Sequence, residues 1–268
     1  MMKVRWVLAT ILITGTNVPA LGFGLLAAQS ISSEQQLVDD FQSEGENRDQ
    51  LTFSPYLWGP DVGGTVSLGP VSAPVDLSLT QLASGIKIAG MGHVQYETGP
   101  VFLYAEGIGA KFGDPEFSSF ANQPVSASAL LLETGAGFIE NVKLTDNFHI
   151  NISPYAGVRY VHLEAEVSGP VIAVAGKNEW VDPVVGAIGA VQLNDRWGII
   201  GKVDFAGLSL TDNSYRNLAI GLQYQASNRL ALVAGYRSTK GSFTADHGLS
   251  ADLSANGPMI GLRYSLRN

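Results

Sequence analysis

The feature that most constrains this chain is the strict alternation of apolar and polar residues in two consecutive runs between Trp197 and Ala226. In the first run Phe205 falls on one face, and Lys202 and Asp204 fall on the other. The second run alternates in the same way, with apolar residues at the even positions from Leu218 to Tyr224. Because successive side chains of a strand point to opposite faces, each run predicts a β-strand with one apolar wall and one small or polar wall.

Similar strand-like runs recur along the chain from residue 51 onward, and no long helical period appears. We expect ten strands, at about 51–68, 84–97, 101–112, 126–140, 147–166, 179–193, 197–207, 215–226, 229–240 and 255–266. Short connections at 98–100, 141–146, 194–196 and 227–228 alternate with longer ones at 69–83, 113–125, 167–178, 208–214 and 241–254. Short turns on one rim and long loops on the other are typical of outer-membrane barrels. The predicted fold is therefore all-β, an up-and-down antiparallel transmembrane β-barrel of ten strands, with eight as the alternative count.

The composition narrows the class of function. The formal net charge of −8 and the absence of a basic stripe argue against nucleic acid as a partner. The chain has no cysteine, which excludes disulfides and thiolate chemistry. Only 15% of its residues are charged, which suits strands whose faces meet something other than bulk water.

The amino terminus has the layout of a secretory signal peptide. Lys3 and Arg5 precede an apolar stretch from Trp6 to Gly15, and small residues follow it. A retained membrane helix is the alternative, since no charge interrupts the sequence from Trp6 to Ala28. We expect a signal peptide at 1–28, an acidic and mobile linker at 29–50 and the barrel at 51–268.

Aromatic residues indicate which wall of the strands faces lipid. If the chain direction alternates, aromatic side chains of the apolar wall gather near both rims, as rings do at lipid headgroups. The lipid-facing girdle candidates are Tyr96, Phe148, Tyr160, Trp197, Phe205, Tyr224, Tyr236 and Tyr264. The runs at 101–112 and 126–140 alternate less cleanly, and their phase is not fixed by the pattern.

The polar wall carries several ions. The lumen-lining candidates are Lys87, His93, Glu97, Arg159, Asp182, Lys202, Asp204, Arg237 and Arg263. A soluble β-protein, the alternative reading, would avoid these residues in its interior because unpaired buried charge is costly. In a membrane barrel they would line a wet or ion-paired lumen, either as a salt-bridge network that fills it or as a charge-selective constriction.

The candidate chemistry is sparse. His93 and Glu106 face one another if their hairpin is centred on residues 99–100, and a His–carboxylate pair could do acid–base work. A lumen ion pair is the favoured interpretation, because no nucleophile is evidently placed beside it. Arg159 and Asp182 are expected to pair across the fifth and sixth predicted strands. The sequence predicts no catalytic, cofactor-binding or metal-binding residues, and hence no enzyme.

The chain resembles the small outer-membrane β-barrel proteins of Gram-negative bacteria, of the opacity-protein and OmpW-like kind. The resemblance rests on four segments, at 54–59 (SPYLWG), 180–186 (WVDPVVG), 235–237 (GYR) and 257–264 (GPMIGLRY). It implies a location in the cell outer membrane, insertion by the barrel-assembly machinery, and contact with outer-membrane lipid and lipopolysaccharide. Barrels of this kind usually end on an aromatic residue, whereas this chain ends Leu266, Arg267, Asn268.

These observations leave three functional hypotheses. The first is an integral outer-membrane protein of the cell envelope that is structural or forms a narrow, porin-like pore for small solutes. The second is a surface adhesin or antigen that binds through the long loops. The third, suggested only by His93 and His149 on the predicted lumen wall, is a lipid hydrolase.

Overall fold

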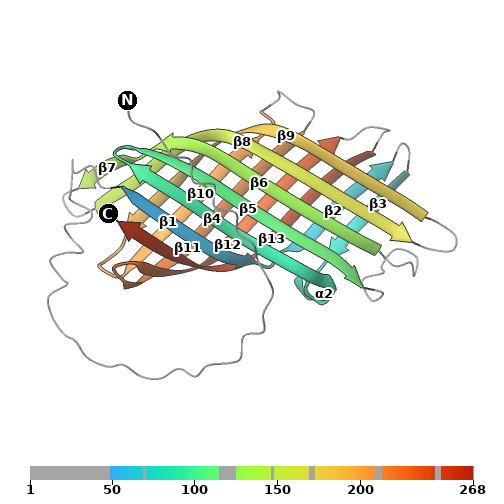
Figure 1. The fold of residues 1–268 in the computed structure, drawn as a ribbon, viewed down its shortest axis with the longest axis horizontal. Coiled ribbons are helices and arrows are strands. Elements are labelled where there is room, and N and C mark those ends of the chain that lie inside the picture. The colour runs from blue at the N-terminus through green and yellow to red at the C-terminus, as the bar shows by residue number, and fades with distance from the viewer. Residues whose placement is uncertain are drawn as a thin grey trace, which may run out of the picture.

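The computed structural model describes residues 49–68, 71–114, 125–145, 148–168, 173–208, 213–244 and 249–267. Within them, ten antiparallel strands close into one barrel (Figure 1). The predicted signal peptide, residues 1–28, and the predicted linker up to residue 48 lie outside the described residues.

Each predicted run contains at least one strand. The strands are β1 (Gln50–Trp58), β2 (Asp61–Leu68), β3 (Val71–Leu77), β4 (Ile86–Thr98), β5 (Val101–Asp114), β6 (Val125–Phe138), β7 (Glu140–Thr145), β8 (Phe148–Ser168), β9 (Ala173–Gln192), β10 (Trp197–Ala206), β11 (Ser214–Ser227), β12 (Leu230–Thr244) and β13 (Leu249–Arg267). One helix, α2 (Leu79–Gly85), separates β3 from β4.

The barrel wall follows the chain order, as expected for an up-and-down barrel. Neighbours run β1-β4-β5-β6-β8-β9-β10-β11-β12-β13, and β1 pairs with β13 from Gln50↔Arg267 to Trp58↔Met259 to close the wall. The tight connections after β4, β9 and β11 lie at one end, which we call the turn rim. The opposite end, where β5, β8, β10 and β12 finish, is the loop rim (Figure 1).

The predicted strand 51–68 is two strands that share one place in the wall. β1 pairs with the turn-rim half of β13, and β2 pairs with its loop-rim half up to Leu249↔Leu68. Between them, the backbone at Gly59 comes so close to Gly257 that a Cβ on Gly257 would clash with the Gly59 carbonyl. β2 then turns to β3, and in the described chain neither is paired with β4, whose pairing with β1 ends at Pro55↔Gly92.

The predicted loop at 69–83 therefore contains β3 and most of α2, and this part of the prediction was wrong. Helix α2 begins with a capping box, in which Ser78 and Gln81 satisfy each other's backbone amides. The Asp61 carboxylate on β2 accepts a 2.6 Å hydrogen bond from the amide of Leu79. No helix in the described part of the chain is long and apolar enough to cross a membrane.

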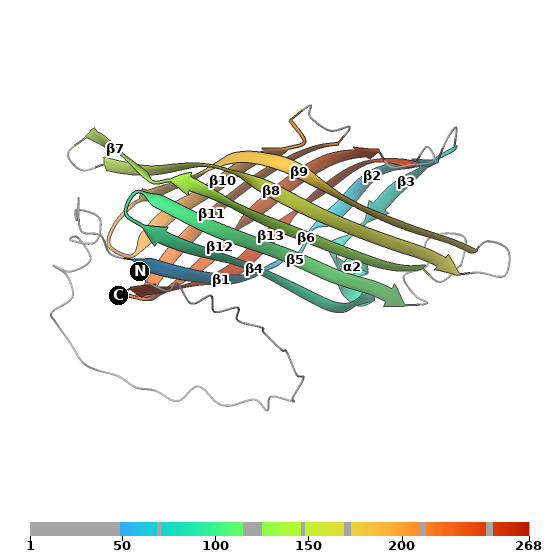
Figure 2. The ribbon, with the colours of Figure 1, turned by 45° about the horizontal axis from the view of Figure 1, so that its top comes forward.

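Two other predicted loops are largely strand. β12 and β13 pair as far as Thr244↔Ser250, so most of 241–254 belongs to the wall, and β8 and β9 pair as far as Ser168↔Ala173. The predicted turn at 141–146 holds β7, which pairs back onto β8. The physical reason is that the backbone ladder continues beyond the apolar part of the wall, as where Lys240, Ser242 and Thr244 follow Tyr236 at alternate positions of β12. An apolar-run criterion does not detect such an extension. Figure 2 shows β8 and β9 extending farther toward the loop rim than β5.

Candidate functional site

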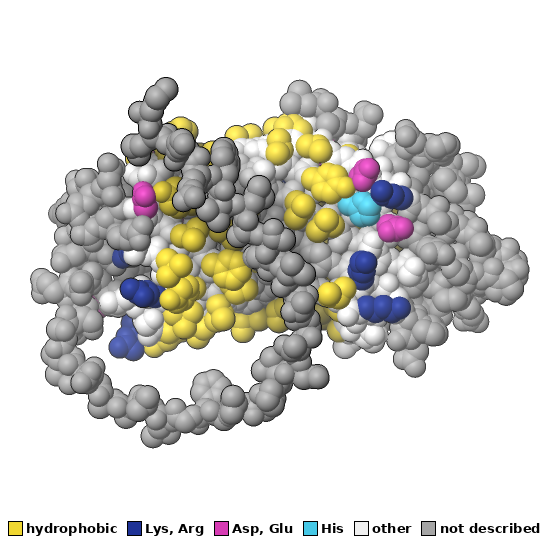
Figure 3. Space-filling model, in the orientation of Figure 1, with side chains coloured by type: hydrophobic (Ala, Val, Ile, Leu, Met, Phe, Trp, Pro, Cys, Tyr) yellow, Lys and Arg dark blue, Asp and Glu magenta, His cyan; other side chains and the backbone are white. Residues whose placement is uncertain are grey.

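The outer wall is apolar in its middle. Leu218, Ile220 and Leu222 of β11 are 57%, 58% and 43% exposed, while Asp204 on the opposite face of β10 is fully buried. Figure 3 shows the same arrangement over the visible face, where hydrophobic side chains form a band between two groups of charged ones. An exposed apolar band of this kind is stable only against hydrocarbon.

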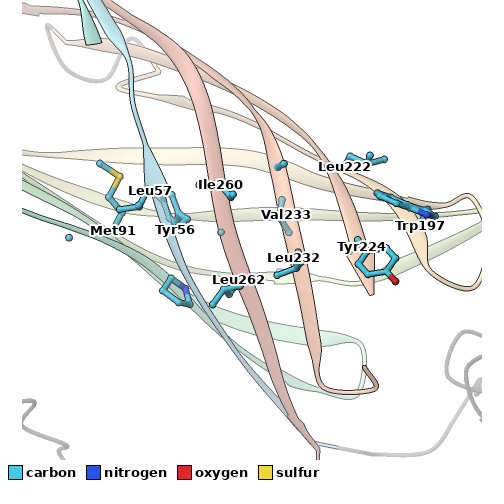
Figure 4. A pocket seen from close by; sticks show the side chains of 14 residues that line it. Tyr56, Leu57, Met91, Trp197, Leu222, Tyr224, Leu232, Val233, Ile260 and Leu262 are labelled. Atoms are coloured by element: carbon cyan, nitrogen blue, oxygen red, sulfur yellow. The ribbon is translucent and has the colours of Figure 1, made fainter. Parts of the chain in front are cut away.

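The outer wall of β10 to β13, β1 and β4 also forms a shallow apolar groove of about 890 Å³ (Figure 4). Its outward-facing lining residues include Trp197, Leu222, Leu232, Ile260, Leu262 and Leu57. The groove lies within the apolar band, so we expect lipid acyl chains to occupy it.

Predicted girdle residues take the following places. Tyr96, Trp197, Phe205, Tyr236 and Tyr264 have exposed side chains, between 38% and 50%. Tyr160 and Tyr224 are half-buried. Phe148 begins β8, but its side chain lies outside the described residues.

Inside the barrel, six ionisable side chains meet at mid-height in what we call the central charge cluster. It comprises Glu106 of β5, Glu133 of β6, Arg159 of β8, Lys202 and Asp204 of β10, and Arg237 of β12. Three acids face three bases, so the formal charges of the cluster balance. Neutrality matters because a buried charge without a partner is strongly destabilising.

Arg159 joins the two acids on either side of it. Its Nη2 donates to Asp204 Oδ1 at 2.7 Å and also to Glu133 Oε2, and its Nε donates to Glu133 Oε2 at 2.8 Å. All three side chains are at most 2% exposed. The guanidinium also lies 4.1 Å from the ring centroid of Tyr215, a cation–π contact.

Glu106 connects opposite walls of the barrel. It accepts 2.5 Å and 3.0 Å bonds from Lys202 Nζ and Arg237 Nη1, although β5 lies four places along the wall from both β10 and β12. Tyr56 of β1 adds a 2.6 Å hydrogen bond to Glu106 and accepts one of 2.9 Å from Arg237. These contacts reach across the lumen from one side of the wall to the other.

Neutral polar side chains complete the network. Asn217 donates to Asp204 at 2.7 Å and accepts from Arg237 Nε at 2.8 Å, so it joins two ions of opposite sign. Tyr155 donates to Asp204 at 3.2 Å, and Tyr104 donates to Glu133 at 3.0 Å. Each carboxylate thus accepts several hydrogen bonds, as buried charges require.

Aromatic rings pack beside the cluster, and the residues facing them are glycines because there is no space for a Cβ. Phe102, Tyr104 and Tyr155 belong to one buried apolar group with Val184 and Ala206. A Cβ on Gly186 would lie 2.6 Å from the Tyr155 ring, and one on Gly137 would lie 2.5 Å from the Phe102 ring. The inner wall is therefore closely fitted around these rings.

Four of the predicted lumen residues, Arg159, Lys202, Asp204 and Arg237, lie in the cluster, and His93 lies beside it. His93 is opposite Glu106 in the register, as the hairpin geometry predicted, with Nδ1 4.0 Å from the carboxylate. Its ring stacks on Tyr104 at 5.8 Å, and its Nε2 is 3.3 Å from the amide oxygen of Gln95.

The other predicted lumen residues are not among these six side chains. Asp182 is buried opposite Arg159 and accepts a 2.7 Å bond from Trp180 Nε1. Glu97 accepts a 2.8 Å bond from Gln95, and Arg263 lies 3.5 Å from Gln223. Lys87 is exposed near the loop-rim end of β4, at the bulge where the pairing with β5 shifts.

Sequence reasoning missed Glu133, Tyr56 and Asn217. Glu133 lies in the run whose phase was left open, and only its pairing with Arg159 across β6 and β8 assigns it to the inner face. Asn217 did stand on the predicted polar face of its strand but is not ionic, and the facing of Tyr56 was not predicted. A search for uncharged hydrogen-bonding residues at the same height would have found them. In the part of the chain that the structure describes, no three His, Asp or Glu residues gather as metal ligands would.

Comparison with known proteins gives structural likeness only. No family model matches the sequence, and no curated protein is similar to it in sequence. The outer membrane protease OmpT from Escherichia coli is similar in structure, with a TM-score of 0.48 and 9% identity over 83% of this chain and 99% of that one. Ail, the attachment invasion locus protein of Yersinia pestis, has a TM-score of 0.36 and 9% identity over 82% and 100%. Neisserial surface protein A has a TM-score of 0.31 and 12% identity over 80% and 96%.

The class of the protein follows from its own architecture. Only a closed barrel lets strands cross hydrocarbon with every backbone group paired, and an apolar outer band with polar residues inside is the arrangement of outer-membrane barrels. This chain is an integral outer-membrane β-barrel protein, located in the cell outer membrane. The finer resemblance to the OmpW-like kind stays a prediction.

Proposed function

We propose that this protein has a structural role in the outer membrane, as a barrel whose lumen is closed at mid-height. The observation that carries the proposal is the bridge from Glu106 to Lys202 and Arg237, which joins opposite walls with buried, hydrogen-bonded charges. Barrels of about this strand number enclose little more than their own side chains. A solute pore would need the cluster to open.

Opening the cluster is costly, which supports a lasting closure. Separating a buried ion pair leaves both charges in a low-dielectric interior, and removal of one partner typically costs about 3–5 kcal/mol. Arg159 and Asp204 also contact neutral partners, Tyr215 and Asn217 of β11, so opening the cluster would break these contacts as well. The closed lumen therefore fits a structural protein better than a narrow pore.

Planar-bilayer recording on the refolded chain tests the proposal. We expect the native protein to show no conductance above baseline. The double variant Glu106→Ala with Lys202→Ala removes one acid and one base, keeps the remaining cluster neutral and should produce small steps. The control, Glu97→Ala with Arg263→Ala, removes an inward-facing pair outside the cluster and should stay silent.

Heat-modifiable migration in gels would first establish that each variant forms a barrel. Stepwise conductance of the native protein would overturn the closed lumen and favour the narrow pore. A silent Glu106→Ala, Lys202→Ala barrel would show that something other than the cluster closes it.

A second candidate function is binding at the cell surface. It is favoured by the length of β8 and β9, which extend beyond the apolar band at the loop rim. β8 and β9 contain 21 and 20 residues, about twice the 9–11 that cross a bilayer. Their outer face past Tyr160 carries polar groups, including the ion pair of Lys177 and Glu179 at 3.7 Å. Such a raised polar surface could present an adhesive or antigenic face.

The register shows how to shorten this hairpin without changing the barrel. His162 pairs with Glu179, so replacing residues 163–178 by a two-residue Asn-Gly turn should keep the wall below intact. If the protein is an adhesin, this variant still folds and loses binding to host cells. Unchanged binding would remove the β8–β9 hairpin from consideration.

We further propose that the protein is not a hydrolase. Glu106, the carboxylate beside His93, is already bonded to Lys202, Arg237 and Tyr56, which makes it a poor partner for acid–base work. Membranes containing the His93→Ala variant should have the lipid products of the native protein. A change in those products would contradict the proposal.

A further inference from the structure

A small notch opens on the loop rim where β10 stops before its neighbours. It has a volume of about 480 Å³, and its lining includes Phe205, Leu208, Arg216 and Lys240. β10 and β11 pair as far as Ala206↔Tyr215, while β11 continues to pair with β12 at Ser214↔Ser242. The notch is therefore bounded by the end of one strand and the continuing edge of the next two.

The turn that ends β10 places a leucine at this notch. Gly207 has a φ of 85° and Leu208 a φ of 47°, so two consecutive residues lie in the left-handed region. Residues with a Cβ are uncommon there, and leucine has no side-chain hydrogen bond to compensate. Even so, Leu208 remains 39% exposed. A strained residue that presents an apolar side chain at the surface points to a functional constraint.

Two basic side chains stand side by side at the same level. Phe205, Arg216 and Lys240 are direct register partners across β10, β11 and β12, and all three have exposed side chains. Among the described residues, no carboxylate lies within ion-pair distance of Arg216 or Lys240. Their charge is thus available on a chain whose net charge is −8.

The depth of Arg216 and Lys240 in the membrane indicates which part of the lipid lies beside them. Phe205 and Tyr236 are exposed aromatic residues at the loop-rim edge of the apolar band, where rings lie at headgroup level. Arg216 pairs directly with Phe205, and Lys240 lies four residues beyond Tyr236 toward the loop rim. Basic residues at this level attract anionic lipid headgroups.

We propose that the notch binds a phosphorylated lipid of the outer leaflet. Arg216 and Lys240 hold the phosphate, with Arg216 able to donate two parallel hydrogen bonds to it. Phe205 and Leu208 supply the apolar part of the notch beside the phosphate. The proposal goes beyond the closed lumen and does not depend on it, because the notch and the central charge cluster share no residue.

The test compares two charge-matched double variants of the full chain, refolded in neutral detergent. Arg216→Gln with Lys240→Gln removes the proposed site. Lys111→Gln with Lys177→Gln removes the same charge from other exposed positions toward the loop rim, on β5 and β9. Native mass spectrometry with diphosphorylated lipid A measures binding. We expect at least a tenfold loss of affinity in the first variant and less than a twofold loss in the control.

Two further probes separate the possible sources of the phosphate. Dephosphorylated lipid A should bind the native protein at least tenfold more weakly, and inorganic phosphate at millimolar concentration should compete poorly. Equal losses in both double variants would overturn the site in favour of general electrostatic attraction. Strong competition by inorganic phosphate would overturn the lipid as ligand.

Leu208→Gly provides a test that does not depend on charge. Glycine adopts a φ of 47° without penalty, so this variant should fold at least as well as the native chain. The proposal expects it to bind diphosphorylated lipid A several-fold more weakly. Unchanged lipid binding together with increased stability would show that Leu208 has no part in the site.

Discussion

The two faces of the β10–β11 hairpin share one backbone, but the inner face carries buried polar side chains and the outer face carries exposed apolar ones. On the inner face, Asp204 and Asn217 are buried, and each makes hydrogen bonds to named partners on other strands. On the outer face, Leu218 and Ile220 are more than half exposed. The stability of the inner face depends on geometry, because a misplaced charge loses its partner. The stability of the outer face depends only on side-chain polarity, because lipid accommodates any apolar side chain.

This difference has a consequence for tolerance to mutation. Inside the barrel, substitutions that change the shape or charge of a side chain should lower the free energy of unfolding. On the outer face, only substitutions that introduce a polar side chain should lower it. Unfolding by urea of refolded protein in detergent or lipid, followed by tryptophan fluorescence, measures these costs.

Arg159→Leu should have the largest effect. It removes the cation that Glu133 and Asp204 share, and leaves two buried carboxylates with one base fewer. We expect a loss of about 3–5 kcal/mol in the free energy of unfolding. Adding Asp204→Asn should recover part of that loss, since it removes one of the uncompensated charges. A loss below about 1 kcal/mol would contradict a buried network.

Ile220→Arg tests the outer face. Ile220 lies midway between Arg216 and Tyr224 on β11, at the middle of the apolar band. A lipid-facing arginine at this depth should cost about 2–4 kcal/mol. Gln223→Arg, on the polar inner face of the same strand, should cost less than about 1 kcal/mol because a long side chain there can reach water. Similar costs for the two variants would mean that the facing is wrong.

Glycine-to-alanine changes sharpen the contrast in packing. A Cβ on inward-facing Gly157 would clash with the Thr134 carbonyl, whereas a Cβ on Gly90 of β4 would have no neighbour within 4 Å. Gly157→Ala should therefore cost about 1–3 kcal/mol through displacement of the backbone. Gly90→Ala should change stability by less than about 0.5 kcal/mol. Equal tolerance at both positions would argue against a closely fitted interior.

Lys177→Gln should have the smallest effect. Lys177 and Glu179 form a 3.7 Å ion pair whose side chains are both more than half exposed. Exposed pairs contribute about 0–1 kcal/mol and are screened by salt. We expect a change below about 0.5 kcal/mol that disappears in high salt. A larger change would mean that the raised β8–β9 hairpin contributes to the stability of the barrel.

Strand positions could be predicted well where alternation was unbroken, as from Trp197 to Ala226, because that signal is local. The prediction failed where polar residues continued a strand beyond the lipid, as in β12 and β13 toward Thr244 and Leu249. It also failed at 69–83, where a short hairpin and helix α2 replaced the expected loop. In both places the pairing partner, rather than the pattern of the strand itself, determines the structure.

The order of residues along each strand sets which side chains share a wall, since a period of two residues is a property of the strand alone. Lys202 and Asp204 therefore oppose Val203 and Phe205. Which charges meet depends on how the strands close into a barrel. Lys202 bonds to Glu106, 96 residues away, because closing the wall sets the two strands across the lumen from one another. That distance across the barrel depends on how many strands close it and how they tilt, which no local pattern encodes.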